Sequence, residues 1–235
     1  MKRYQERTLW ALALCASVGL WAVVGAQAPS RIAAPGTPAV SPAAGTDTFD
    51  SIAEIQPFSG DGQTDFGLID LVGPTTVVRG NPQRGPQPRT YQIDTELVSM
   101  NLTGFSSMLG GDVTVRESPT RASTGRITGP SKVGFPANSF FDVFVEIDVP
   151  GIGRLHNEQA VRLISIIHGI PPIEDAYNAP ENLAVPLLDS QGIVRALLGH
   201  VQHVPCQPSH RKIKRELILL EKKLDLLLQI VDGDG

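Results

Sequence analysis

Hydrophobic and polar side chains alternate with a period of two through the middle of the chain. In "FFDVFVEIDV", residues 140–149, the odd-numbered positions are all apolar, and the even-numbered positions include Asp142, Glu146 and Asp148. A strand with one face in a core and the other in water shows this alternation. We therefore expect a half-buried strand that carries three carboxylates on its outer face.

A second alternating run changes phase part of the way along. In "TYQIDTEL", residues 90–97, the apolar face begins at Tyr91 and Ile93 and also holds Thr95 and Leu97, whereas in the next residues the apolar phase moves to Val98, Met100 and Leu102. One extra residue in a strand shifts every later side chain to the other face. The sequence therefore predicts a β-bulge near Val98.

Further short strands are separated by turns rich in glycine and proline. The strand candidates are residues 75–79, 112–117, 160–169, 184–189 and 192–204. The turns between them include "RGNPQRGPQP", "LGGD", "VPGIG" and "IPPIEDAYNAP". Short strands joined by such turns, without a helical period between them, indicate an antiparallel β-sandwich or barrel, which we place at residues 47–205.

The pattern changes to a helical period in residues 209–231. Pro208 separates this segment from the β-domain, Ser209 can cap a first turn, and Asp232 with Gly233 supplies a stop. Six apolar residues recur at spacings of 4, 3, 4, 3 and 4, namely Ile213, Leu217, Leu220, Leu224, Leu227 and Val231. This spacing is typical of a coiled-coil seam, so we expect a homo-oligomerisation helix, and its flanking leucines favour three or more chains.

Two other environments would also cover this helix, namely its own β-domain or a membrane surface. Membrane-surface helices carry basic residues along their polar face. Here Glu216, Glu221 and Asp225 alternate with Lys222 and Lys223, which disfavours the membrane. Docking on the β-domain stays open as the alternative to self-association.

The first 26 residues have the layout of a secretory signal peptide. Lys2, Arg3 and Arg7 precede an apolar run at residues 9–24, and the small residues of "GAQA" follow. We expect cleavage after Ala26, hence export to the periplasm or the extracellular space and no transmembrane segment in the mature chain. The Ala- and Pro-rich residues 27–46 predict a semi-extended linker.

The charge of the chain bears on its partners. The full sequence has a formal net charge of −4, and residues 27–208 hold 18 acidic against 11 basic residues, a net of −7. Nucleic-acid binding needs a basic surface. We therefore expect no nucleic-acid partner.

Four runs of the sequence resemble an uncharacterised family of exported bacterial proteins, a domain of unknown function. These runs are "VGPTTVVRG", "VTVRESPTRASTGRI", "FPANSFFDVFVEIDVPGIGRLHN" and "IHGIPPI". The resemblance covers about residues 66–205. It implies export and a β-rich domain, and it brings no activity or site residue with it.

The carboxylates of the 140–149 strand offer a candidate site. If Asp142, Glu146 and Asp148 lay beside Asp94 and Glu96 of the 90–97 run, they could supply oxygens to Ca²⁺ or form a glycosidase-like acid pair. The simpler interpretation is a solvated sheet face, with Arg162 or Arg116 across the strands. Calcium is the one cofactor that this pattern suggests.

Neither the spacing of the histidines nor a search for common catalytic motifs supports an enzymatic function. His200 and His203 of "HVQH" would point to opposite faces of a strand, which argues against a shared metal, whereas His156 is expected in a loop. The sequence has no G-x-S-x-G, P-loop or H-E-x-x-H motif. We therefore expect an exported, non-catalytic structural or ligand-binding module, and the alternative is a secreted carboxylate- or metal-dependent hydrolase that acts on a cell-surface polymer.

Overall fold

The computed structural model describes residues 43–131 and 134–233, with side chains up to residue 230. Its strands are β1 (Gly45–Ser59), β2 (Ile69–Arg79), β3 (Gln83–Arg84), β4 (Thr90–Ser106), β5 (Gly111–Glu117), β6 (Ser123–Pro130), β7 (Ala137–Val143), β8 (Val145–Val149), β9 (Gly153–Asn157), β10 (Val161–Ile167), β11 (Tyr177–Asn178), β12 (Val185–Leu188) and β13 (Val194–Cys206). Helix α2 (Pro208–Gly233) follows them. The predicted signal peptide and most of the predicted linker lie outside the described residues.

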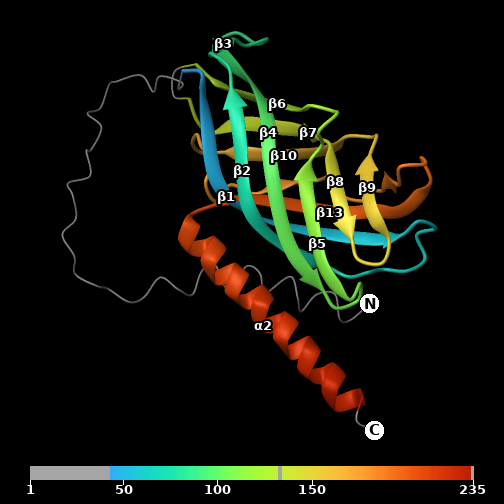
Figure 1. Ribbon diagram of the computed structural model, residues 1–235. Helices are drawn as coiled ribbons and strands as arrows, with labels where there is room; N and C mark the ends of the chain where they lie inside the picture. The colour runs from blue at the N-terminus through green and yellow to red at the C-terminus, as the bar shows by residue number, and fades with distance from the viewer. Residues whose placement is uncertain (1–42, 132–133, 234–235) are drawn as a thin grey trace, which may run out of the picture. The chain divides into compact units, whose positions relative to one another are not determined.

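The strands form one antiparallel sheet that closes on itself (Figure 1). Strand pairing runs from β1 through β2, β4, β5, β8, β9, β12 and β13, and β13 pairs with β1 again. A second circuit leaves β4 through β6, β7, β10 and β11 and also returns to β13. The predicted mostly β, antiparallel fold is confirmed, and the ring of pairings gives the sheet the closed form of a barrel.

The alternation in the sequence matches the inside and the outside of this barrel. Along β4, Ile93 and Leu97 are buried in the core, whereas Val98 and Ser99 are both exposed. The register between β2 and β4 shifts at this point, because Thr76 pairs with Ser99 and Val77 pairs with Leu97. The extra residue on β4 is Val98, so the predicted bulge is confirmed.

The predicted strand at residues 140–149 is divided in two. Strand β7 ends at Val143 and β8 begins at Val145, with Phe144 outside both ladders. The backbone N–H of Phe144 donates to the Ser123 hydroxyl at 2.8 Å, and its carbonyl accepts from the N–H of Ser118 at 3.0 Å. The interruption lets one continuous stretch pair with β6 and β10 before it and with β5 and β9 after it.

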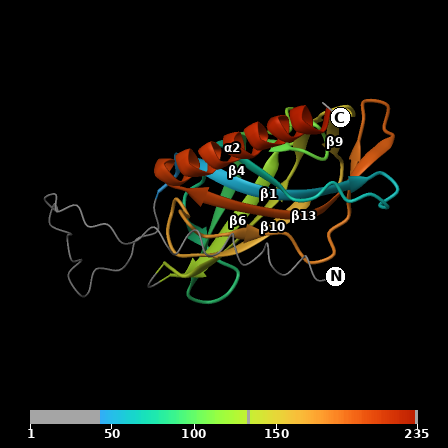
Figure 2. The same cartoon turned by 90° about the horizontal axis from the view of Figure 1, so that it is seen from below.

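Helix α2 packs across β1, β2 and β4 on the outside of the barrel (Figure 2). Its docked side carries one buried apolar residue, Ile218, which is 8% exposed. Around it, three cations of the helix form ion pairs with the barrel, namely Arg211 with Asp50 (2.7 Å), Lys214 with Asp70 (2.6 Å) and Lys222 with Asp112 (2.7 Å). The Lys222 ammonium also lies 5.4 Å from the centre of the Phe105 ring.

The predicted seam faces away from this contact. Ile213, Leu217, Leu220, Leu224 and Leu227 are all exposed, and Leu224 retains 59% of its surface. At 100° per residue, these positions lie on the side of the helix roughly opposite Ile218. Docking on the β-domain thus occurs through a charged stripe and leaves these five seam residues uncovered. The side chain of the sixth seam residue, Val231, lies outside the described part of the chain. Within the described chain, no helix combines the length and apolar character that a membrane crossing requires.

Candidate ligand-binding cavity

The interior of the barrel contains a cavity of about 80 Å³. Its wall comes from both circuits of strands and is mostly aliphatic and aromatic, including Ile55, Leu71, Leu102, Phe141 and Leu163. A single buried water needs about 10–15 Å³ measured in the same way. The cavity therefore has room for several water-sized groups, in surroundings that favour apolar atoms.

Six polar side chains also line the cavity, and four of them have partners within the protein. Arg79 Nη1 donates to the Asp47 carboxylate, and Arg79 Nε donates to the carbonyl of Ala43 at 3.0 Å. Thr75 Oγ1 accepts from the Ser51 hydroxyl at 2.8 Å, and the Tyr177 hydroxyl donates to Ser139 Oγ at 2.9 Å. The charges of the wall are thus balanced by a single ion pair.

The other two polar residues of the wall are Thr95 on β4 and His203 on β13. Their Oγ1 and Nε2 atoms are the buried side-chain polar atoms without a hydrogen-bond partner in the described chain. Thr95 is only 6% exposed. His203 keeps intermediate accessibility although its Nε2 is enclosed, as expected for a side chain beside a cavity. Buried polar atoms in proteins are nearly always hydrogen-bonded, so this pair is unusual.

Burial changes the titration of two groups in the wall. Removal from water lowers the pKa of His203 to about 4, because the charged imidazolium is disfavoured there. The same effect raises the pKa of Tyr177 to about 12, against a smaller opposing effect from the hydrogen bond with Ser139. Both side chains are therefore neutral at pH 7.

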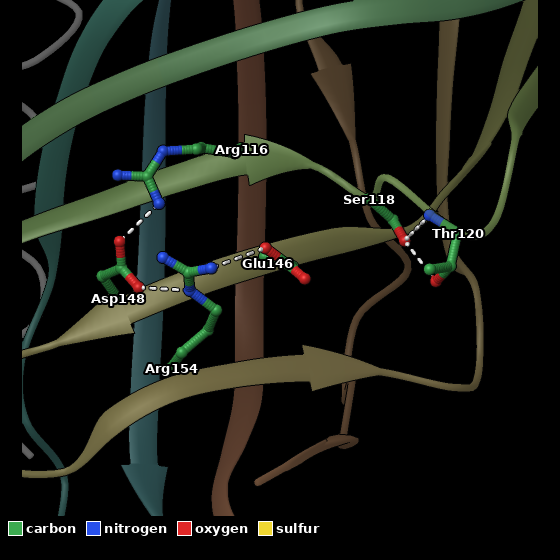
Figure 3. A network of polar contacts seen from close by, with 6 residues as sticks. All are labelled: Arg116, Ser118, Thr120, Glu146, Asp148 and Arg154. Carbon is green, nitrogen blue, oxygen red and sulfur yellow. Dashed lines mark hydrogen bonds and ion pairs between the residues drawn. The ribbon is translucent and has the colours of Figure 1, made fainter. Parts of the chain in front are cut away.

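The predicted carboxylate site lies outside the barrel, where arginines occupy it (Figure 3). Arg154 Nε donates to Asp148 at 2.9 Å, and Arg116 Nη1 donates to the other oxygen of the same carboxylate. Hydrogen bonds from Arg154 and then from Arg116 lower the pKa of Asp148. Glu146 lies 3.6 Å from Arg154 Nη1. Ser118 and Thr120, also drawn in Figure 3, are hydrogen-bonded to each other in the turn after β5.

Asp142 has a separate arginine partner on the neighbouring strand. Arg162 of β10 donates to both carboxylate oxygens, at 2.8 and 2.5 Å, and its guanidinium lies 4.6 Å from the centre of the Phe140 ring. Strand β6 separates Asp142 from Glu96, so the two acidic strands are not neighbours. The described residues contain no group of three or more His, Cys, Asp or Glu side chains placed to hold a metal ion. Calcium binding at Asp142, Glu146 and Asp148 stays a prediction from the sequence.

The histidines of the second half are dispersed. His200 lies against Glu54, with Nε2 3.3 Å from the carboxylate, whereas His203 lines the cavity. His156 does not lie in a loop, as expected from the sequence, but in β9, where it is in register with Glu146. The neighbouring Asn157 is buried and holds the two sides of the Phe144 interruption, because its amide bonds with Val143 and Val145.

Comparisons with known proteins place this chain in a family. A solved structure, that of DynF from the dynemicin biosynthesis pathway of Micromonospora chersina, superposes with a TM-score of 0.61 at 23% identity, covering 80% of this chain and 96% of that one. This likeness shows a shared fold. No curated protein matches. Residues 30–202 match a family of unknown function, DUF6073. The chain therefore belongs to this family of unknown function.

Proposed function

We propose that this chain is an exported, non-catalytic binding module that holds an apolar ligand inside its barrel and self-associates through α2. The observation that supports binding is the interior cavity with its predominantly apolar wall. Ligand sites are typically concave and apolar with a few fixed polar groups, and this cavity has that composition. Support for export comes from the signal-peptide pattern of residues 1–26.

Filling the cavity is expected to abolish binding of an apolar probe. Ala53 lines the wall, and Ala53→Leu would place three additional carbon atoms in the space that a ligand needs. We expect the purified chain to bind the neutral fluorophore 1-aminoanthracene and Ala53→Leu to bind it at least about tenfold more weakly, because overpacking excludes the ligand. The measurement is a fluorescence titration.

The matched control is Ala122→Leu. Ala122 is exposed in the loop between β5 and β6, so the same change there should leave the affinity for the fluorophore unaltered. Equal affinities for the wild type and Ala53→Leu would mean that the fluorophore binds elsewhere, and an absence of saturable binding would refute the proposed ligand site.

Self-association is proposed because of the way α2 is docked. The side against the barrel is held by ion pairs, and the side that carries the seam is exposed. An apolar stripe of this length is stabilised by burial, and its 4-3-4 spacing fits the same stripe of a second copy. Several copies of a binding domain on one assembly would also raise avidity without new contacts.

A charge in the seam is expected to dissociate this assembly. Leu224→Lys would place an ammonium in the seam, whereas Leu226→Lys places one on an exposed position outside it; the two leucines are 59% and 51% exposed. We expect light scattering to give an oligomer for the wild type and Leu226→Lys and a monomer for Leu224→Lys, because a buried unpaired charge is costly. A monomeric wild type, or equal masses for the two variants, would contradict self-association through the seam.

The alternative, a secreted hydrolase, has weaker support. The carboxylates that it would use are paired with Arg154, Arg116 and Arg162. A general acid in a glycosidase needs a raised pKa, whereas the pKa of Asp148 is lowered. We therefore favour the binding module.

A further inference from the structure

We infer that the ligand of the barrel is a neutral, largely apolar molecule with a hydroxyl or carbonyl group, and that His203 Nε2 is its anchor, with Thr95 Oγ1 as a second contact. This inference rests on the proposed function, since it specifies the chemistry of the molecule held in the same cavity. It also assigns roles to the two polar atoms of the wall that have no partner in the described chain.

The cost of unpaired polar atoms supports the anchoring role. A buried hydrogen-bonding atom without a partner destabilises the fold, and natural sequences remove most such atoms. The wall could hold valine at position 95 and an apolar ring at position 203 without disturbing any hydrogen bond of the described residues. A ligand that bonds with these atoms would satisfy them.

The two contacts reach the cavity from different walls. Strands β4 and β13 are separated by β1 and β2 on one side of the ring, and by β6, β7, β10 and β11 on the other. Thr95 is in register with Arg79 and Gly125, whereas His203 is in register with Ala53 and Tyr177. Because three strand spacings of about 4.8 Å separate β4 from β13, the two residues would contact different parts of one ligand.

The charges of the wall favour a neutral polar group over a carboxylate. Arg79 is the cation of the wall, and its guanidinium already donates to Asp47 and to the carbonyl of Ala43. A ligand carboxylate that took Arg79 would leave Asp47 as an unpaired, half-buried charge, which is unfavourable. In a neutral imidazole Nε2 donates or accepts according to the tautomer, and the threonine hydroxyl can both donate and accept, which suits an alcohol or a carbonyl group.

Competition between matched eight-carbon compounds tests this inference on the purified full chain. The compounds are octan-1-ol, octan-2-one, octanoate and octane, each titrated at pH 7.5 against bound 1-aminoanthracene. Because their solubilities differ, the informative quantity is the affinity of octan-1-ol relative to octane in each variant. We expect His203→Phe to reduce this ratio about tenfold and Thr95→Val to reduce it less, as one net hydrogen bond predicts.

His200→Phe is the matched control, because His200 lies on the same strand but pairs with Glu54 away from the cavity wall. Its ratio should equal that of the wild type. In the wild type, octanoate should bind at least about tenfold more weakly than octan-1-ol, because it would bring an unpaired charge into the cavity.

The outcomes separate this inference from the proposed function. If 1-aminoanthracene binds but the ratio in His203→Phe equals that in the wild type, or if octanoate binds as tightly as octan-1-ol, the neutral polar anchor is wrong and the apolar site stands. If neither the fluorophore nor any of the four compounds binds, the proposed function fails and this inference fails with it.

Discussion

Replacing Asn157 by alanine is expected to lower the free energy of unfolding by about 3 kcal/mol, because it removes a buried amide that spans the interruption between β7 and β8. Asn157 is 2% exposed. Its Oδ1 accepts from the N–H of Val145 at 2.7 Å, and its Nδ2 donates to the carbonyls of Val143 at 3.0 Å and Gln159 at 2.8 Å. Alanine would remove the partner of the buried backbone groups of Val143 and Val145, which costs more than the loss of exposed hydrogen bonds.

Urea unfolding of the variant and of a matched control tests this expectation. Asn178 is exposed, and its Oδ1 accepts from Gln202 Nε2 on the barrel surface, so Asn178→Ala should change stability by less than about 0.5 kcal/mol. If Asn157→Ala behaved like this control, the two halves of the interrupted strand would be held by the rest of the sheet alone.

The same interruption shows where prediction from the sequence reaches its limit. The alternation predicted which residues of 140–149 point inward, and Val143, Val145 and Ile147 are all buried. The break at Phe144 leaves this alternation unchanged, so the break could not be predicted from the pattern. The groups that make it, Ser123 and Asn157, are distant in the sequence. The bulge at Val98 was predictable because it changes the phase of the pattern itself.

The strands that the sequence analysis missed include β6 and β1, in which several inward positions are not apolar. In β6, Gly125 and Gly129 face inward, and a Cβ at Gly125 would lie 2.2 Å from the carbonyl oxygen of Phe140. Glycine is needed there for close packing, yet in a sequence it suggests a turn. In β1, the hydroxyl of the buried Ser51 donates a hydrogen bond to Thr75 Oγ1 on β2. Alternation along one strand does not identify such a partner on another strand.

The cavity and the docking of α2 depend on contacts between distant segments. Alternation predicted that Thr95 faces inward and that His203 and His200 point to opposite faces of their strand. Whether the inward side chains fill the barrel or leave a cavity depends on all the facing strands together, which alternation along single strands does not give. For α2, the spacing of the apolar residues predicted the seam. Docking on the β-domain was expected as the alternative to self-association. The helix docks through its charged stripe, because Asp50, Asp70 and Asp112 of the barrel pair with its cations, and this docking leaves the seam residues exposed.

The buried imidazole of His203 is expected to make the protein up to about 3 kcal/mol less stable at pH 4 than at pH 7. In the unfolded chain the pKa of a histidine is about 6.5, whereas burial lowers that of His203 to about 4. Above pH 6.5 the residue is neutral in both states and contributes nothing to the pH dependence. Between pH 6.5 and 4 the unfolded state binds a proton that the folded state does not, so stability falls as the pH falls.

The difference between the wild type and His203→Phe isolates this contribution. Carboxylates and the other histidines titrate in both proteins, so their contributions to the pH dependence cancel in the difference. The charged residues in the cavity wall, Asp47 and Arg79, are paired with each other. Urea unfolding at several pH values should show that the wild type loses up to about 3 kcal/mol more than His203→Phe between pH 7 and pH 4. Parallel stability curves would place the imidazole in contact with water, and the cavity would then not exclude solvent from His203.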